Sequence, residues 1–254
     1  MKKIRIVVIV ITLIFVIIYI KNTWKILFNI KNVNGNIHCS ESIEDIRNIL
    51  NSKRDKIIIV DSGHGGNDPG KVGINNALEK DINLSIAFKL RDCLVKSGFS
   101  VIMTRNSDNG LYSDIDRNKK SADLRNRVTL INESDAIAVV SIHQNSFTTS
   151  SEKGAQVFYH TNSEISKNIA KCVQESLKNN HDNTNKRIEK SNSSYYLLKK
   201  TIKPTIIVEC GFLSNYEEAD KLQNEEYQIS IAEAINNGII IWANNILTDN
   251  LISK

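Results

Sequence analysis

The stretch that decides the fold is KIIIVDSGHGGNDPG, residues 56–70. Its first five residues, Lys56–Val60, form a β-branched apolar run, which is typical of a short strand buried on both faces. The strand ends at a glycine-rich loop, and apolar residues then fall mostly on one helical face between Asp81 and Lys96. Gly98 is placed to end that helix. A buried strand, a loop and a helix in this order predict the first unit of an α/β sheet.

Strands and helices continue to alternate along the rest of the chain. Further strands are predicted at Ser100–Met103, Ala136–Ile142, Ala155–Tyr159 and Thr205–Val208, and further helices at Ala122–Asn132, Glu164–Asn179 and Glu225–Ile246. This order predicts a single α/β domain over residues 56–248, with a central, mostly parallel sheet flanked by helices. Residues 249–254 are expected to form a C-terminal tail. Two polar stretches, residues 106–121 and 180–194, are predicted to be surface loops.

An N-terminal hydrophobic segment precedes the domain. The apolar run Ile6–Ile20 follows MKKIR and is followed by Lys21, a pattern typical of an export signal or a membrane anchor. We expect residues 1–24 to be an uncleaved anchor, because no small-x-small cleavage site follows them; a cleaved signal peptide is the alternative. The basic N-terminus would stay in the cytoplasm, so the domain would be exported. Residues 25–55 are expected to form a tether with a short helical stretch.

The charge distribution excludes one class of partner. The net charge of +5 is accounted for by five basic residues within residues 1–30, a segment that contains no acidic residue. Basic and acidic residues are therefore equal in number in the rest of the chain, which lacks the excess of positive charge that phosphate backbones require. We expect no nucleic acid among the partners. The four cysteines match neither a zinc knuckle nor a redox CxxC motif.

Four chemically active residues are predicted to lie near one edge of the sheet. In open α/β sheets ligands bind at the carboxyl ends of the strands, and three predicted strands end near His64, His143 and Glu209. Glu79 lies where the glycine-rich loop meets the first helix. Two imidazoles and one carboxylate are a recurrent catalytic zinc set, and a further carboxylate can serve as general base. These four residues together favour metal-assisted hydrolysis, although each of them taken alone could also be explained by an ordinary structural role.

Five linked motifs then identify a resemblance that covers about residues 56–247. The set closely resembles the zinc-dependent N-acetylmuramoyl-L-alanine amidases, which hydrolyse the amide between the lactyl group of N-acetylmuramic acid and the first L-alanine of the peptide stem in peptidoglycan. The motifs are DSGHGG, Glu79, TRNSD (Thr104–Asp108), SIHQN and VECGFLSN (Val208–Asn215), with YQISIAEAINNGI after them. One departure is Gln144, which occupies a position where a small residue is common and is expected to narrow the pocket beside His143.

The resemblance implies a role for each residue of the set. It implies that His64, Glu79 and His143 bind Zn²⁺ and that Glu209 is the catalytic carboxylate, which takes a proton from water and passes it to the leaving amine. Asp61 is expected either to orient a zinc ligand from outside the ligand set or to cap backbone amides of the loop. Asn145 is a candidate for binding substrate.

Alternatives remain open for the reaction and for the biological role. A zinc peptidase acting on the peptide stem and a non-catalytic wall-binding protein are the alternatives to an amidase. One catalytic domain on a short tether is similar in layout to the sporulation-specific amidases, which remove stem peptides so that muramic lactam forms in the spore cortex. The expected location is then the outer face of the membrane, in the space between the forespore membranes. A vegetative wall-remodelling role is the alternative, and a protein partner that rigidifies a three-ligand site is a further expectation.

Overall fold

The structure, a computed structural model, describes residues 42–52 and 55–252. The predicted anchor, residues 1–24, and much of the predicted tether lie outside the described residues. The elements in chain order are α2 (Ile43–Asn51), β1 (Ile57–Ser62), α3 (Glu79–Lys96), β2 (Ser100–Met103), α4 (Lys119–Asn132), β3 (Ala138–Asn145), β4 (Gln156–Tyr159), α5 (Glu164–Asn180), β5 (Lys190–Ser191), α6 (Tyr196–Lys200), β6 (Thr205–Phe212), α7 (Tyr216–Lys221) and α8 (Glu225–Ile252).

The strands form one six-stranded sheet in the order β2-β1-β3-β6-β4-β5. The pairs β1–β2, β1–β3, β3–β6 and β4–β5 are parallel, and only the pair β4–β6 is antiparallel among these neighbours. The predicted α/β class with a mostly parallel sheet is therefore confirmed. One difference from the prediction is β5, a two-residue edge strand inside the polar stretch that was expected to be a loop.

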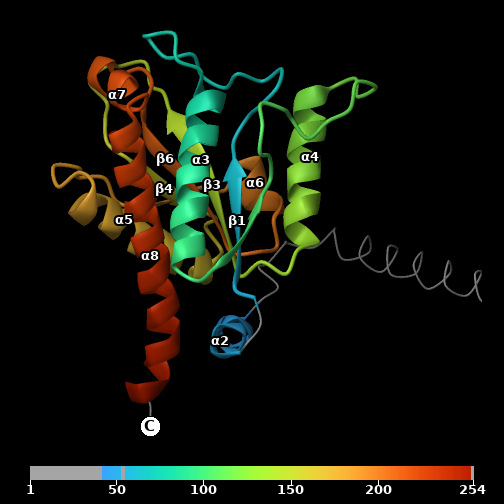
Figure 1. The fold of residues 1–254 in the computed structure, drawn as a ribbon, viewed down its shortest axis with the longest axis vertical. Coiled ribbons are helices and arrows are strands. Elements are labelled where there is room, and N and C mark those ends of the chain that lie inside the picture. The colour runs from blue at the N-terminus through green and yellow to red at the C-terminus, as the bar shows by residue number, and fades with distance from the viewer. Residues whose placement is uncertain (1–41, 53–54, 253–254) are drawn as a thin grey trace, which may run out of the picture. The chain divides into compact units, whose positions relative to one another are not determined.

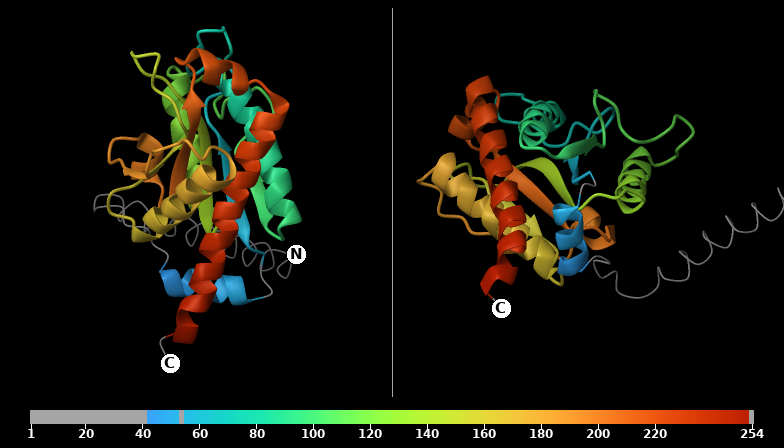
Figure 2. Two further views of the ribbon diagram at one scale, coloured as in Figure 1. Left: turned by 90° about the vertical axis from the view of Figure 1, so that its left-hand side faces the viewer. Right: turned by 60° about the horizontal axis from the view of Figure 1, so that its bottom comes forward.

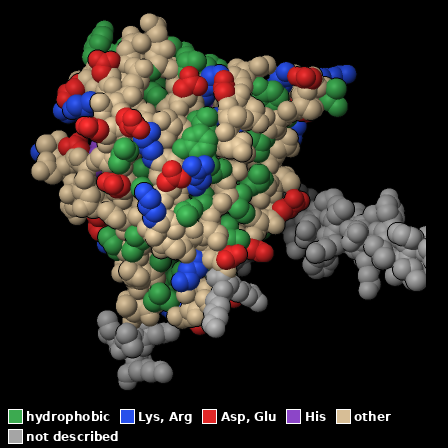
Figure 3. Space-filling view, in the orientation of Figure 1, with side chains coloured by type: hydrophobic (Ala, Val, Ile, Leu, Met, Phe, Trp, Pro, Cys, Tyr) green, Lys and Arg blue, Asp and Glu red, His purple; other side chains and the backbone are tan. Residues whose placement is uncertain are grey.

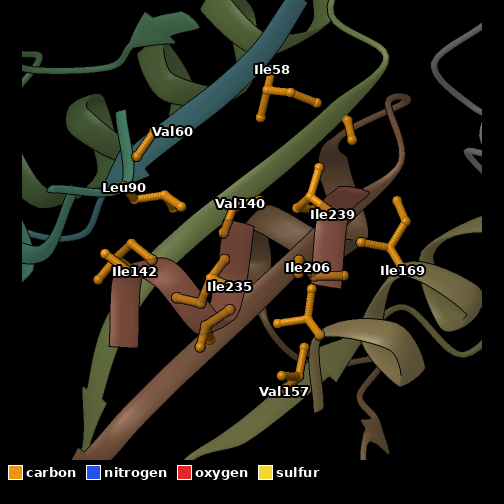
Figure 4. Packing of buried hydrophobic residues seen from close by; sticks show 14 of the residues in the cluster. Ile58, Val60, Leu90, Val140, Ile142, Val157, Ile169, Ile206, Ile235 and Ile239 are labelled. Atoms are coloured by element: carbon orange, nitrogen blue, oxygen red, sulfur yellow. The ribbon is translucent and has the colours of Figure 1, made fainter. Parts of the chain in front are cut away.

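Helices cover both faces of the sheet because side chains alternate along each strand (Figures 1 and 2). Ile58, Val60, Val140 and Ile142 point to one face and pack in the large core cluster with residues of α3, α5 and α8 (Figure 4). The intervening residues, including Ile59 and Val139, point to the other face and pack against α4 and α6. On the face drawn in Figure 3, acidic and basic side chains are interspersed.

Helix α2 belongs to the folded domain, although it lies within the expected tether. Ser42 caps the helix in a capping box with Asp45, and Ile46 and Leu50 are buried in the large core cluster. The Arg47 Nε donates a hydrogen bond of 2.9 Å to the backbone oxygen of Ile246 in α8. The amphipathic spacing that predicted a short helix thus also provides the apolar side chains that dock it.

Helix α8 is longer than predicted and continues to Ile252, through part of the expected C-terminal tail. The segment after Ile246 contains neither glycine nor proline, so nothing in it breaks the helix. Within the described part of the chain, no helix combines the length and the hydropathy that crossing a membrane requires.

Candidate active site

The sheet brings four of the predicted residues to one region of its carboxyl edge. Asp61 in β1 is the register partner of Ser141 in β3, and His143 in β3 is the register partner of Glu209 in β6. Residues in register, or two positions apart on one strand, point to the same face of a sheet. Asp61, His143 and Glu209 therefore share the face that α4 and α6 cover, and Glu79 reaches this edge from the first turn of α3.

The three predicted ligands form a compact group. The candidate ligand atoms of His64, Glu79 and His143 all lie within 4.8 Å of one another. Glu79 Oε1 lies 3.2 Å from His64 Nε2 and 3.0 Å from His143 Nδ1. Two imidazoles and one carboxylate, with no fourth protein ligand in this group, are the donor set of an open catalytic zinc site. The residues present therefore fit a zinc ion.

Glu79 is held in place by the backbone around it. The Glu79 side chain is almost fully buried, and its Oε2 accepts a 2.7 Å hydrogen bond from the Lys71 amide while Oε1 accepts a 3.1 Å bond from the Gln144 amide. Burial opposes ionisation, but the hydrogen bonds from the two histidines outweigh it and hold the pKa of Glu79 well below its usual range. The carboxylate is thus ionised, as a metal ligand must be.

His64 is positioned by an unusual backbone conformation and by a carboxylate that the sequence analysis did not select. His64 has φ of 62°, in the left-handed region that non-glycine residues rarely adopt. Its Nδ1 lies 3.0 Å from Asp68 Oδ2, and Asp68 Oδ1 accepts a hydrogen bond from the Gly70 amide. A carboxylate bound to the second ring nitrogen is the usual way to orient a metal-ligating histidine. Asp68 lies in the motif-bearing loop, four residues after His64, which is the signal that could have identified it.

Glu209 has the surroundings of a general base. Its side chain is buried, and its Oε2 has no hydrogen-bond partner among the described residues. Burial raises the pKa of Glu209 to about 7; His143 opposes this shift and Glu79 adds to it. The Tyr195 side chain opposes burial and lowers the pKa of Glu209, and its ring packs edge-to-face on Phe158 with centroids 5.5 Å apart. Tyr195 was not singled out from the sequence, because a tyrosine in a polar loop carries no periodic signal.

Asp61 lies in a buried hydrogen-bond network beside the site, and its expected role in orienting a zinc ligand stays a prediction. Its carboxylate accepts hydrogen bonds from Ser141 Oγ (2.5 Å), Arg127 Nη1 (2.6 Å) and Thr104 Oγ1 (2.7 Å). It makes no hydrogen bond to the three ligands or to the amides of the glycine-rich loop within the described residues. One link from Asp61 to the site runs through Arg127, whose Nη2 donates a 2.6 Å bond to the His64 backbone oxygen, and another is the electrostatic interaction of Asp61 with His143.

Asn145 and Gln144 illustrate how strand alternation decides side-chain direction. Gln144 is buried and its Nε2 donates to Asn83 Oδ1 at 3.1 Å, on the opposite face from His143, so the expectation that it narrows the pocket beside His143 is wrong. The Asn145 Oδ1 accepts a 2.8 Å hydrogen bond from the Ser146 amide, and its role in binding substrate stays a prediction. His160 and His181 lie outside the ligand group, whereas His38 lies outside the described residues.

Comparison with known proteins agrees with this geometry. A family model described as N-acetylmuramoyl-L-alanine amidase matches residues 58–240. This chain belongs to the N-acetylmuramoyl-L-alanine amidase family. Among relatives, the germination-specific N-acetylmuramoyl-L-alanine amidase of Bacillus subtilis is 41% identical over 188 residues, which cover 73% of this chain and 78% of that protein.

Solved structures of N-acetylmuramoyl-L-alanine amidases share the fold. The CwlD amidase of Clostridioides difficile, solved in complex with the GerS lipoprotein, has 44% identity and a TM-score of 0.73, covering 75% of this chain and 99% of that one. Another amidase, from Clostridium difficile 630, has 31% identity and a TM-score of 0.66, covering 75% of this chain and 97% of that one. The present chain is thus an N-acetylmuramoyl-L-alanine amidase, and its group of His64, Glu79 and His143 is one that could hold the metal typical of this family.

Proposed function

We propose that this amidase uses zinc held by His64, Glu79 and His143 to release peptide stems from N-acetylmuramic acid, and that it does so in the spore cortex. The observation that carries the chemical part is the position of Glu209. Its buried Oε2, which has no hydrogen-bond partner in the described part of the chain, lies on the same sheet face as His143, its register partner, beside the three-ligand group. A free carboxylate beside an open metal site is the arrangement of a metal-assisted hydrolase.

Glu209, Glu79 and Asp68 have different roles in the proposed reaction. When bound, zinc supplies Lewis-acid activation of water and of the substrate carbonyl. Glu209 accepts a proton from the attacking water and then donates it to the nitrogen of the leaving L-alanine, which departs as a neutral amine. Glu79 stays ionised and accepts hydrogen bonds from backbone amides, and Asp68 keeps the His64 ring in one orientation.

Product analysis tests the proposed reaction. The purified protein is stripped with a chelator and incubated with peptidoglycan, with and without restored zinc. We expect zinc-dependent release of peptides whose new amino terminus is L-alanine. New amino termini within the stem would instead identify a peptidase, and unchanged peptidoglycan in the presence of zinc would favour a wall-binding protein.

Metal analysis of His143→Ala tests the ligand set. We expect this variant to contain less zinc than wild type, and equal zinc content in the two proteins would remove His143 from the ligand set.

The variant Glu209→Gln tests the proposed base. Glutamine is nearly isosteric with glutamate but cannot accept the proton, so we expect zinc content and fold to be preserved while turnover falls by ~10²- to 10⁴-fold. Glu217→Gln provides a control, because Glu217 lies on the surface of α7 and pairs with Lys221. Turnover of Glu209→Gln within a few-fold of the control would contradict the role.

The spore cortex is the proposed site of action. Support comes from the similarity to a germination-specific amidase and to the CwlD amidase. Deleting the gene and analysing cortex muropeptides provides the test: we expect spores without muramic lactam. Normal muramic lactam together with chains of unseparated vegetative cells would favour the vegetative remodelling role.

A membrane-anchored, exported location is part of the proposal and rests on the apolar run within residues 1–24. We expect the full-length protein to sediment with membranes and a version that begins near residue 31 to remain in solution. A mature protein with a cleaved N-terminus would identify a secreted enzyme.

A protein partner is also proposed, because the CwlD amidase was solved with a lipoprotein bound. Such a partner would raise zinc occupancy by rigidifying the three-ligand group. Full zinc loading and full activity of the amidase alone would contradict this requirement.

A further inference from the structure

Two buried arginines lie beneath the glycine-rich loop, and neither has a place in the mechanism above. Arg105 and Arg127 are 3% and 2% exposed. Between them they donate hydrogen bonds to the backbone oxygens of three successive residues, Ser62, Gly63 and His64. Each of these three neighbouring carbonyls accepts a hydrogen bond from a buried guanidinium group. The segment that carries His64 is therefore held in one conformation.

Arg105 differs from Arg127 in the groups that it contacts. Arg127 pairs with the carboxylates of Asp61 and Asp123. Within the described parts of the chain, Arg105 forms no ion pair, and its hydrogen bonds go to backbone oxygens. They are Ser62 (3.0 Å from Nε), Gly63 (3.1 Å from Nη2), Lys80 (2.7 Å from Nη2) and Ser107 (3.0 Å from Nη1). The buried charge therefore serves to bind backbone rather than to neutralise an acid.

The partners of Arg105 lie next to two different metal ligands. Gly63 directly precedes His64, and Lys80 directly follows Glu79 in the first turn of α3. The same Nη2 donates to both backbone oxygens, so one rigid guanidinium group spans the loop and the helix. We infer that Arg105 is a positioning residue that sets the separation of His64 and Glu79 and thereby the affinity of the site for zinc.

Two other side chains of α3 also reach the loop: Asn83 Nδ2 donates to the Gly63 oxygen (3.2 Å) and Lys80 Nζ donates to the Gly66 oxygen (3.0 Å). Arg105 differs from both because it lies outside α3 and donates to the loop and to the helix at the same time. The side chains of Asp68 and Arg127 fix His64 from its own side, and the Lys71 amide fixes Glu79 from the loop. Lysine at position 105 would retain the charge but not the planar fork of donors that reaches several carbonyls at once. Without the fork, the loop that carries His64 and the helix that carries Glu79 would be joined by fewer hydrogen bonds, so their spacing would be less tightly fixed.

The test compares Arg105→Lys with Arg47→Lys in the full-length protein. Arg47 is the matched control, because it also joins two segments through a backbone oxygen but lies between α2 and α8. Zinc dissociation constants are measured by competition with a chelator, and melting temperatures are measured without metal. We expect Arg105→Lys to weaken zinc binding by about 10- to 100-fold and Arg47→Lys to stay within about two-fold of wild type, while both lower the melting temperature.

A spectroscopic readout separates positioning from general destabilisation. With Co²⁺ bound in place of zinc, the absorption bands of Arg105→Lys are expected to shift, whereas those of Arg47→Lys are expected to match wild type. If Arg105→Lys fails to fold, Arg105→Gln, which retains one amide donor, takes its place. Zinc affinity of the position-105 variant equal to that of the control would overturn the inference.

This inference rests on the proposed use of zinc, and the wild-type protein separates the two failures. Wild type without measurable zinc affinity would overturn the proposed function together with the inference. Wild type that binds zinc tightly, with a position-105 variant that binds it equally well, would overturn the inference alone.

Discussion

Glycine at positions 63 and 70 allows the side chains of the site to pack against the loop. A Cβ atom on Gly63 would overlap the ring of His143, and one on Gly70 would overlap the carboxylate of Glu79 and lie 2.8 Å from His64 Cδ2. Gly70 also has φ of 70°. Two glycines of the loop thus make room for side chains of the ligand group.

Gly63→Ala is expected to damage the metal site more than the fold. The added methyl group must displace the His143 ring or the β1 end, so zinc affinity should fall by at least about ten-fold. Gly98→Ala is the control, because a Cβ on Gly98 meets no atom within 4 Å although the residue has φ of 87°. Metal titration of both variants checks this; equal zinc affinities would contradict the steric argument.

Residues that act through the backbone were the hardest to identify from sequence. Arg105 lies in the TRNSD motif and Asp68 lies in the glycine-rich loop, but neither position reveals which atoms its side chain will contact. Arg127 follows Asp123 by four residues, which is the usual spacing of a surface ion pair on a helix. Its burial becomes evident only when β1 and α4 are packed together.

At the scale of elements, the Asp61–Arg127–Asp123 cluster joins β1 to α4. Arg127 Nη1 lies 2.6 Å from Asp61 Oδ1, and its Nε lies 2.6 Å from Asp123 Oδ2. Burial opposes ionisation of Asp61, but Arg127, Ser141 and Thr104 outweigh it and lower the pKa of Asp61 to about 2. The helix is therefore held to the sheet by a pair that must stay charged.

The pH dependence of stability follows from this lowered pKa. Because the folded-state pKa of Asp61 lies below its ordinary value of 3.8, its contribution is complete above about pH 4 and is lost as the pH falls toward 2. Asp61→Asn leaves a buried guanidinium short of a partner and should lower the free energy of unfolding at pH 7 by about 3 kcal/mol. Its stability should also fall less steeply than that of wild type between pH 4 and pH 2.

Urea unfolding of wild type, Asp61→Asn and Asp114→Asn at several pH values measures this effect. Asp114 is the control, because its side chain is exposed and pairs only with Lys119 among the described residues. Curves for Asp61→Asn that run parallel to wild type across the acid range would remove Asp61 as the source of the pH dependence.

The strand and helix order was predictable, but strand ends and one strand direction were not. Apolar runs located β1, β3 and β6, yet each strand continues through the polar residues of the site, because Asp61, His143 and Glu209 still pair with neighbours. The pattern of apolar residues does not show whether a strand runs parallel or antiparallel to its neighbour. The absence of a predicted helix between β3 and β4 was a signal against a parallel crossover, and β4 is indeed antiparallel to β6.

At the scale of the whole molecule, the large core cluster spans the domain from α2 to α8. Ile46 and Leu50 of α2 pack in the same cluster as Trp242 and Ile246 of α8. The metal-binding group lies elsewhere, at the carboxyl edge of the sheet. Docking of α2 should therefore contribute to stability without affecting zinc affinity.

Ile46→Ala tests this separation of stability from chemistry. Ile46 is fully buried, so we expect the free energy of unfolding to fall by about 3 kcal/mol. Ile43→Ala on the same helix is the control, because Ile43 is 40% exposed. Zinc affinity should be unchanged in both variants, and a weaker zinc complex in Ile46→Ala would mean that the core and the site are coupled.

Helix α2 and the reactive groups lie on opposite sides of the domain. In Figure 1 the arrow of β1 points away from α2, so the chain enters the domain on the side opposite the reactive carboxyl edge. The start of the described domain and its reactive groups therefore lie at opposite ends of the sheet, and the sheet itself separates the two.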